Sequence, residues 1–410
     1  MESSKNRLTI GGILVSTVLV FAMFTVLEEA IGIHGPTVLV VDADGFASLD
    51  QSSQPDCNGT TSAAADPNDA IYSSIQDAVN APGPHFIIVC PGTYGSLSIG
   101  DTERIYGLSG AIIDGGGVAA SAVSISGVNT VCGSPDRTVI DGFEITGATG
   151  NGITVADSCR VFIQDNDIHD NDVRGILFGR GDHSWIDNNE IHDNPEGIEL
   201  GENSNDNFIG HNRIHDNTGF GIEINENFTP PTSIRNLISQ NTFTDNGEWA
   251  ICLCGGSGAT SNKVVGNKAT GNGAAGGAFA GGGAYLVIGT SNTLRSNTAK
   301  SNTGTAFKLE VFGPVTSMFN TLTKNRAIST TGDGFVVLGD TNTFTKNLAR
   351  INTLDGFEAT VASSGNTFKE NTADTNGDEG FRDDGTANVF MGNICIADGS
   401  TPDGLGAGCT

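Results

Sequence analysis

The chain has 410 residues, 47 of them acidic and 20 basic, so its formal net charge is −27 and its pI is about 4.3. Neutralising phosphates needs clustered Lys and Arg, so this composition excludes a nucleic-acid-binding protein. The 37% hydrophobic content excludes a disordered polyelectrolyte, and 57 glycines without a triplet period exclude collagen. Length alone predicts two or three domains, but an internal repeat overrides that expectation.

The amino-terminal segment, residues 1–34, is predicted to direct export. Lys5 and Arg7 precede an uncharged run, residues 8–27, that is long enough to cross a bilayer once as a helix. A cleaved signal peptide and an uncleaved membrane anchor both fit this run, and a buried core helix is the third alternative. In the first two cases Lys5 and Arg7 stay inside, so the rest of the chain is extracellular or held at the cell surface.

The eight cysteines agree with an oxidising compartment, because their number is even. Three local disulfides are plausible, Cys57 with Cys90, Cys132 with Cys159, and Cys395 with Cys409, although the sequence does not fix their connectivity. Metal binding is the rival interpretation. Cys252 and Cys254 have the wrong spacing for a zinc knuckle, and the chain contains no CxxC. We therefore predict no cysteine metal site.

An asparagine repeat begins near residue 139. The central column recurs every 22 to 30 residues and comprises Asn166, Asn189, Asn212, Asn241, Asn267, Asn297, Asn325, Asn347, Asn371 and Asn393. Most of these residues have another asparagine five positions before and a third five positions after them. Apolar residues alternate between the asparagines, and a Gly/Ala-Φ-x-Φ segment follows, where Φ is a large apolar residue. Each apolar stretch is too short for a helix but suits a strand of three to five residues.

Three short strands per repeat form one coil of a parallel β-helix. Neighbouring coils lie about 4.8 Å apart, so equivalent asparagines stack and their amides can hydrogen-bond to each other. Asn and Gly at the joints are expected to supply left-handed backbone conformations. Residues 35–115 are predicted to form the cap and first coils, with a capping helix over about residues 70–81, and residues 116–396 the repeats. Residues 397–410 form a tail that a disulfide could tie down.

The cap and the repeat resemble a known group of proteins. YSSIQDAVNAPGPHFIIVCPGTYGSLSI, residues 72–99, is similar to the amino-terminal cap of the pectin-lyase-like superfamily of secreted right-handed β-helix proteins. The asparagine repeats resemble the carbohydrate-binding and sugar-hydrolase (CASH) repeat of the same group. The resemblance covers about residues 38–396 and implies an all-β, single-stranded, right-handed parallel β-helix. Relatives include pectate lyases, polygalacturonases, alginate lyases, mannuronan epimerases and phage tailspikes.

The resemblance does not carry a catalytic assignment. The catalytic segments of polygalacturonase-like enzymes and the R-x-P-x-x-R segment of pectate lyases are absent. Mannuronan epimerases carry D-P-H-[DE], and the nearest segment here, residues 167–170, reads D-I-H-D without the proline.

His-Asp-Asn occurs three times at intervals of 23 residues, which predicts an outward column of His169, His192 and His215. As candidate catalytic residues, one of these histidines would act as a base, and Arg174 or Arg180 would neutralise the substrate's charge. Arg213 offers the same neutralising role. Arg174 and Arg180 are expected in turns near the histidines. The candidate carbohydrate-binding residues are Asp170, Asp193, Asp216, Glu190, Arg213, Glu199 and Glu223. A purely structural hydrated ladder is the alternative.

Calcium is the one cofactor that the acidic segments suggest, because it takes several carboxylate and carbonyl oxygens. Asp42 with Asp44 and residues 378–384 are candidates, although no loop has EF-hand spacing and a solvated surface is the favoured interpretation of both segments.

Three functions remain open. The first is a β-helix that binds polysaccharide along a lateral face. The second is an enzyme, either a uronate-polymer lyase or C5-epimerase or a glycoside hydrolase. The third is a structural or adhesive surface protein. The negative charge disfavours tight binding of polyanionic glycans unless calcium bridges them.

Overall fold

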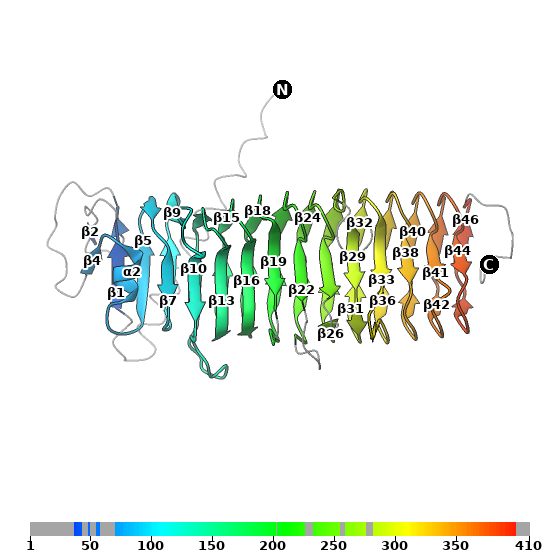
Figure 1. Ribbon diagram of the computed structural model, residues 1–410, viewed down its shortest axis with the longest axis horizontal. Coiled ribbons are helices and arrows are strands. Elements are labelled where there is room, and N and C mark those ends of the chain that lie inside the picture. The colour runs from blue at the N-terminus through cyan, green and yellow to red at the C-terminus, as the bar shows by residue number, and fades with distance from the viewer. Residues whose placement is uncertain are drawn as a thin grey trace, which may run out of the picture.

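Three long parallel sheets wind along the molecule as the three sides of a β-helix (Figure 1). The computed structural model describes residues 37–42, 48–49, 55–57, 70–201, 203–225, 233–254, 259–275 and 282–398. The predicted export segment and Cys409 lie outside these residues. Among the described residues, no helix is both long and apolar enough to span a membrane.

From β5 to β44 each coil contributes one strand to each sheet in the same order. Sheet 1 has 15 strands, arranged as β4 (Ala70–Tyr72), β1 (Thr37–Val41), β5 (His85–Val89), β8 (Arg104–Gly107), β11 (Thr138–Asp141), β14 (Val161–Gln164), β17 (Trp185–Asp187), β20 (Phe208–Gly210), β23 (Leu237–Ser239), β27 (Lys263–Val265), β31 (Thr293–Arg295), β36 (Thr321–Thr323), β39 (Thr343–Thr345), β42 (Thr367–Lys369) and β45 (Val389–Met391).

Sheet 2 has 13 strands, β6 (Gly92–Tyr94), β9 (Ala111–Asp114), β12 (Glu144–Thr146), β15 (Asp167–His169), β18 (Glu190–His192), β21 (Arg213–His215), β24 (Thr242–Thr244), β28 (Lys268–Thr270), β32 (Thr298–Lys300), β37 (Arg326–Ile328), β40 (Leu348–Arg350), β43 (Thr372–Asp374) and β46 (Ile394–Ile396).

Sheet 3 has 12 strands, β7 (Leu97–Ile99), β10 (Ser121–Ser126), β13 (Asn151–Cys159), β16 (Arg174–Asp182), β19 (Glu196–Leu200), β22 (Ile222–Asn225), β25 (Ile251–Cys254), β29 (Gly283–Val287), β33 (Thr305–Leu309), β38 (Phe335–Val337), β41 (Phe357–Ala359) and β44 (Phe381–Asp383). The strands β13 and β16 have nine residues each, so the expected upper limit of five residues is wrong for these two coils.

Three two-stranded sheets complete the described strands. They pair β2 (Ser48–Leu49) with β3 (Pro55–Asp56), β26 (Ala259–Thr260) with β30 (Gly289–Thr290), and β34 (Val311–Phe312) with β35 (Val315–Thr316).

The amino-terminal end is covered by a helix that is shorter than predicted. Residues 70–72 form strand β4, and the helix α2 spans only Ile75–Val79. Ser74 caps it, with its side chain accepting a hydrogen bond from the backbone N–H of Asp77 at 3.0 Å. Ile75 and Ala78 are buried in the core, so α2 shields one end of the coil stack (Figure 1).

Stacked aliphatic and aromatic side chains fill the interior of the β-helix. Ile168, Ile191 and Ile214 occupy one register position on successive coils and are fully buried. Towards the carboxyl end aromatic rings replace the aliphatic side chains of the core. Neighbouring ring centroids are 4.6 to 4.7 Å apart in the stack of Tyr285, Phe307, Phe335, Phe357 and Phe381. Identical shapes at identical positions let each coil pack on the next without voids.

The asparagine columns form the predicted hydrogen-bond ladders. Asn189 is typical, because its Oδ1 accepts from both the backbone N–H and the side-chain amide of Asn166, each at 3.0 Å. Its own Nδ2 donates to the carbonyl of Ile163 at 2.9 Å and to Oδ1 of Asn212 at 3.0 Å. Each buried amide therefore pairs with polar groups of the coils on both sides.

The left-handed backbone conformation lies one residue before each asparagine of the columns, so the prediction is wrong for these asparagines. It is confirmed for the glycines that occupy the preceding position, Gly266, Gly271, Gly365 and Gly392. Asp170, Asp193 and Asp216 have φ angles of 53°, 52° and 53°, and they precede Asn171, Asn194 and Asn217 in the third column. Asparagine is common in this conformation, but here its amide is committed to the ladder. The preceding residue, whose side chain faces solvent, makes the turn instead.

Replacing one ladder amide should destabilise the fold strongly. Asn189→Ala leaves the backbone N–H of Asn166 and the carbonyl of Ile163 without these buried partners. We expect the free energy of unfolding to fall by about 3 kcal/mol, because each unsatisfied buried group costs about 1–3 kcal/mol. Chemical denaturation measures this loss, with the exposed Lys268→Ala as the control variant. Equal stability of the two variants would contradict the structural role of the ladder.

Candidate functional site

The three His-Asp-Asn segments place their histidines in one outward column on sheet 2. His169, His192 and His215 are register partners at the ends of β15, β18 and β21. Their rings stack with centroids 5.0 and 4.9 Å apart and are nearly parallel. The predicted column therefore exists. The neighbouring outward column holds Asp167, Glu190 and Arg213.

Carboxylates flank the imidazoles on both sides. His192 is typical, because its Nδ1 lies 2.7 Å from Oδ2 of Asp193 and its Nε2 lies 3.0 Å from Oδ1 of Asp167 on the preceding coil. A carboxylate can only accept, so both ring nitrogens must donate, which requires the charged imidazolium. Burial lowers the pKa of His192, but the hydrogen bonds and charges of Asp193 and Asp167 outweigh it and raise the pKa above 6.5.

His215 has a different environment because a guanidinium reaches it. Its Nδ1 lies 2.6 Å from Oδ2 of Asp216, as in the other two coils. Its Nε2 lies 3.0 Å from Oε1 of Glu190 and 2.6 Å from Nη1 of Arg213, which also pairs with Glu190. Arginine can only donate, so the Arg213 contact favours a lone pair on Nε2. Among the three histidines, His215 is the one whose ring contacts a guanidinium as well as carboxylates.

The His192 contacts predict a pH-dependent stability. Because its pKa is raised in the folded protein, its stabilising contribution is fully present below pH 6.5 and is lost as pH rises through the raised value. We expect His192→Gln to lower the free energy of unfolding at pH 6, and the loss to shrink at about pH 9. Denaturation at several pH values measures this. The control is His183→Gln, because the nearest carboxylate oxygen, on Asp206, is 3.9 Å from His183. Parallel pH curves for His192→Gln and the parent would contradict the assignment.

A second charged group lies on the outward face of sheet 3. Arg174 begins β16, and its Nε lies 2.8 Å from Oε2 of Glu196 and in close contact with Oε2 of Glu199. Glu223 is the register partner of Glu199 on the next coil. Glu199 and Glu223 are only 8% and 7% exposed. We call Arg174, Glu196, Glu199, Glu223 and Glu248 the Arg–Glu cluster.

Negative charge is in excess in this cluster. Burial, followed by the charges of Glu199 and Glu196, raises the pKa of Glu223 to about 8. Burial also raises the pKa of Glu196 and of Glu248. Glu223 therefore holds its proton at neutral pH, while Glu199 faces the Arg174 guanidinium. A protonated and a salt-bridged carboxyl side by side provide both a hydrogen-bond donor and acceptors for hydroxyl groups.

The structure corrects two predicted arginine positions. Arg174 and Arg180 both lie within strand β16 and not in turns. Arg174 belongs to the Arg–Glu cluster. Arg180 is exposed and pairs with Asp157 on the preceding coil, with Nη2 2.7 Å from Oδ2. No described ion pair joins either arginine to the histidine column.

Among the described residues, carboxylates come close enough to hold a cation in two places. Oxygens of Glu196, Glu199 and Glu223 lie within 4.8 Å of one another, as do those of Asp333, Asp355 and Glu358. Such oxygens suit Ca²⁺, although arginines already pair with members of both groups. Of the predicted calcium segments, Asp44 lies outside the described residues. Asp383 and Asp384 bond to Asn388 and Arg382.

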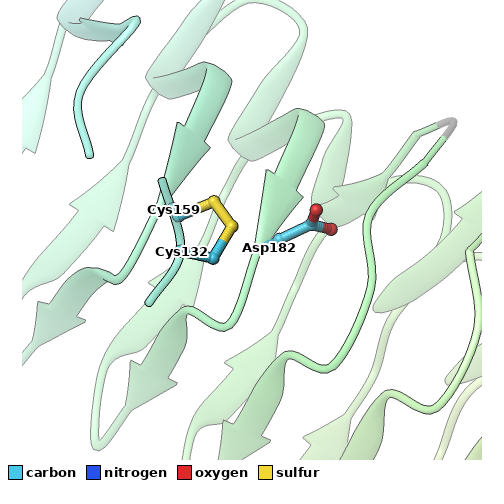
Figure 2. A group of neighbouring side chains, drawn as sticks. All are labelled: Cys132, Cys159 and Asp182. Atoms are coloured by element: carbon cyan, nitrogen blue, oxygen red, sulfur yellow. A yellow bond between two sulfur atoms is a disulfide. The ribbon is translucent and has the colours of Figure 1, made fainter. Parts of the chain in front are cut away.

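A third group, Cys132, Cys159 and Asp182, does not suit a metal (Figure 2). Cys132 and Cys159 form a disulfide, so neither offers a thiolate. This pair and Cys57–Cys90 are as predicted. Cys395 with Cys409 reaches beyond the described residues. Cys252 and Cys254 form a disulfide that the sequence analysis left unassigned, although residues i and i+2 of a strand share a face.

The sequence pattern did not predict the Arg–Glu cluster as one group. Glu199 and Glu223 were predicted as carbohydrate-binding residues, but Glu196 and Glu248 were not predicted as their neighbours. The available signal was the repeated Gly-Φ-Glu segment at 197–199 and 221–223, preceded by Glu196 in the first case. Gly197 packs against the carbonyl of Gly221, where a Cβ would approach to 2.4 Å. This tight joint starts β19 and brings Glu196 beside Glu199.

Neutralising Glu223 should change how stability depends on pH. Its raised pKa means that the folded protein holds a proton that the unfolded chain releases above its ordinary pKa of 4.5. The parent therefore loses stability as pH rises from 4.5 to about 8. We expect Glu223→Gln to remove this loss and to be more stable than the parent above pH 8. Thermal unfolding measures this, with Glu370→Gln as an exposed control. A Gln variant that is less stable at high pH would contradict the assignment.

Comparison with known proteins supports the fold. A family model described as a right handed beta helix region matches residues 121–299. No curated protein matches the sequence. The A-module of mannuronan C-5 epimerase AlgE4 from Azotobacter vinelandii is similar in structure, with 12% identity, a TM-score of 0.51, and coverage of 79% of this chain and 88% of that one.

Two further solved structures are similar at lower scores. An alginate lyase from Paenibacillus sp. str. FPU-7 has 17% identity, covers 76% of this chain and 94% of its own, and has a TM-score of 0.48. The pectate lyase Pel9A has 16% identity, 73% and 78% coverage, and a TM-score of 0.49. The chain thus has a right-handed parallel β-helix fold, and the predicted fold class and handedness are confirmed.

Proposed function

We propose that this protein is an extracellular β-helix that binds a neutral polysaccharide along the lateral face of sheet 3. The observation that carries the proposal is the Arg–Glu cluster. Arg174 is the register partner of Glu196 on the next coil, and Glu199 on that same coil is the register partner of Glu223 on the third. The cluster thus extends over three successive coils along the axis of the molecule. A linear polymer can follow this cluster, and its hydroxyl groups can donate to the carboxylates and accept from Arg174.

The charge of this face selects the class of glycan. Four carboxyl groups accompany one guanidinium in the cluster, and the whole chain carries a net charge of −27. A polyuronate would be repelled unless Ca²⁺ bridged the two sets of carboxylates, whereas a neutral glycan meets no such barrier. The name of the structurally similar mannuronan C-5 epimerase indicates that this fold can serve polysaccharide chemistry.

Export is part of the proposal. Two described disulfides, Cys57–Cys90 and Cys132–Cys159, join cysteines far apart in sequence and support an oxidising compartment. The amino-terminal segment would act as the signal peptide or as the membrane anchor.

A uronate-polymer lyase or C5-epimerase is the second candidate, and the contact between His215 and Arg213 favours it. Such an enzyme needs a base to remove the proton at C5 and a cation to neutralise the uronate. His215 would be the base, once the substrate displaces the contacts of its Nε2, and Arg213 would be the cation. His192 is less suited, because it already carries the proton. A purely structural or adhesive role is the outcome if neither activity is found.

A glycan array with and without Ca²⁺ tests the proposal, using the parent, Arg174→Gln and the matched control Arg180→Gln on the same strand. We expect the parent and the control to retain a neutral glycan without Ca²⁺. Arg174→Gln should weaken retention at least about tenfold, a loss of about 1.4 kcal/mol, since it removes a charge-assisted donor. Circular dichroism confirms that each variant is folded.

The other outcomes are equally informative. Retention of uronates only with Ca²⁺ would overturn the neutral-glycan assignment. Release of unsaturated uronate that is lost in His215→Ala would establish the lyase, and new reducing ends that are lost in Glu223→Gln would establish a hydrolase. No retention of any glycan would overturn the binding proposal.

A further inference from the structure

The outer face of sheet 1 carries a row of aromatic side chains over three coils. Phe162, Trp185 and Phe208 occupy one outward register position on β14, β17 and β20. The ring centroids of Phe162 and Trp185 are 5.2 Å apart, and those of Trp185 and Phe208 are 5.4 Å apart. Trp185 is 48% exposed, and Phe162 and Phe208 are partly exposed. We call these three residues the aromatic row.

The fold does not require aromatic rings at this register position. On later coils of sheet 1 the same position holds threonines that pair in the same sheet: Thr293, Thr321, Thr343 and Thr367. An exposed apolar patch that folding does not need is typical of a binding surface. Because one ring stands on each coil, the row suits a ligand that itself repeats, such as a linear polymer of sugar rings.

Sugar rings match the aromatic row chemically. A pyranose ring presents C–H groups on its faces, which pack against aromatic rings, and hydroxyl groups around its edge. Two residues further along the strands, Gln164 and Asp187 are register partners in the next outward column. Their amide and carboxylate oxygens can accept hydrogen bonds from the hydroxyl groups of a sugar that packs on the row.

Two arginines extend the aromatic row towards the amino-terminal end. The Cζ atom of Arg137 lies 5.1 Å from the ring centroid of Phe162, and that of Arg104 lies 4.9 Å from the ring centroid of Phe86. Tyr106 stacks on Phe86 with centroids 5.9 Å apart. Burial raises the pKa of Tyr106, while the charges of Arg137 and Arg104 oppose this rise. Both guanidiniums therefore lie close enough to act on the same hydroxyl group.

Neither guanidinium has a carboxylate partner among the described residues. Asp141, which also acts on Tyr106, instead accepts a hydrogen bond from Nε2 of Gln164 at 2.7 Å. Several arginines of the following coils do pair with carboxylates: Arg174, Arg180, Arg213 and Arg235. Two unpaired guanidiniums on neighbouring coils of a strongly acidic chain form a local positive site, which an anionic group complements.

We propose that this face of sheet 1, from β5 to β20, binds a polysaccharide in which single carboxylate-bearing sugars are spaced among neutral ones. Neutral sugar rings pack on the aromatic row, and the carboxylate of an acidic sugar pairs with Arg137 and Arg104. A polymer with a carboxylate on every sugar is disfavoured, because the net charge of −27 repels it. The site lies on a different sheet from the Arg–Glu cluster, so this proposal does not depend on the proposed function.

Tryptophan fluorescence of the full chain tests this site. The chain has two tryptophans, and Trp249 is only 1% exposed, so a ligand that packs on the surface changes the emission of Trp185. The probes are oligosaccharide fragments of glucuronoxylan, gum arabic and xanthan, which carry spaced carboxylates, and fragments of neutral arabinoxylan and of polygalacturonate. We expect at least one of the first three to change the emission and to bind at least about tenfold more tightly than the neutral and the fully charged fragments.

Two variants separate the two parts of the site. Phe208→Thr introduces the residue type of the later coils and should weaken binding of that fragment at least about tenfold. Arg137→Gln should abolish the preference for the carboxylate-bearing fragment over the neutral one. The matched controls are Arg295→Gln, an exposed arginine on the same sheet, and Phe312→Thr, which removes a side chain that is 46% exposed elsewhere. Thermal unfolding checks that each variant is folded.

Unchanged emission with every fragment would overturn the proposal, and so would a folded Phe208→Thr or Arg137→Gln variant that binds as the parent does. Tightest binding of the polygalacturonate fragment would overturn the assignment of a sparsely charged polymer. Arg174→Gln alters sheet 3 and should leave these titrations unchanged, so the two glycan sites can fail separately. A loss of binding in this variant would place the fragments on the Arg–Glu cluster and overturn the site on sheet 1.

Discussion

The structure depends on one repeated hydrogen bond, the contact between asparagine amides of successive coils. Each amide is buried, so its polar groups must be satisfied by the coils above and below. The ladder fixes the axial register, because a slip of one residue would leave these amides unpaired and turn the apolar side chains outward. Wherever all three columns are present, they lie five residues apart, as at Asn207, Asn212 and Asn217.

Exact stacking also sets the electrostatics. Equivalent residues on successive coils lie about 5 Å apart, so identical charges in one column repel each other. The histidine column avoids this by placing carboxylates beside each imidazole. The next column changes sign where Arg213 follows Glu190. Glu199 and Glu223 break the rule, because they stack as like groups while buried. A local conflict of this kind is typical of a functional site.

Most of the fold could be predicted from the sequence, because residues that recur along the sequence stack directly on each other in space. The asparagine columns predicted the coils of the β-helix, their short strands and the stacking of equivalent residues. The His-Asp-Asn repeats correctly predicted that His169, His192 and His215 lie beside one another. The conformations of the turns were harder to predict from the sequence. Asparagine was expected in the left-handed conformation. Its amide is instead hydrogen-bonded in the ladder, and the residue before it adopts the left-handed conformation. The predicted length of the helix α2 was too great, because residues 70–72 pair with β1 as an additional strand. Local periodicity in the sequence does not indicate such a long-range pairing.

The candidate site could likewise be predicted only in part, because it also depends on contacts between residues far apart in the sequence. Columns show which residues share a position on successive coils, but they do not show which positions of one coil meet. Glu196 joins Glu199 because the joint at Gly197 folds tightly, and Arg174 reaches both from the coil before. The strand lengths of β13 and β16 likewise depend on the neighbouring coils and not on the repeat pattern.

The number of residues per coil varies, and this variation indicates where residues can be inserted into such a chain. The block from the first to the third asparagine column has a constant length, so the extra residues of the longer repeats fall outside it, as with the hairpin of β34 and β35 between sheets 3 and 1. Insertions at these corners leave the ladders untouched. The corners are therefore natural positions for grafting foreign peptides, and whole coils could be duplicated to lengthen the rod without redesigning its interior.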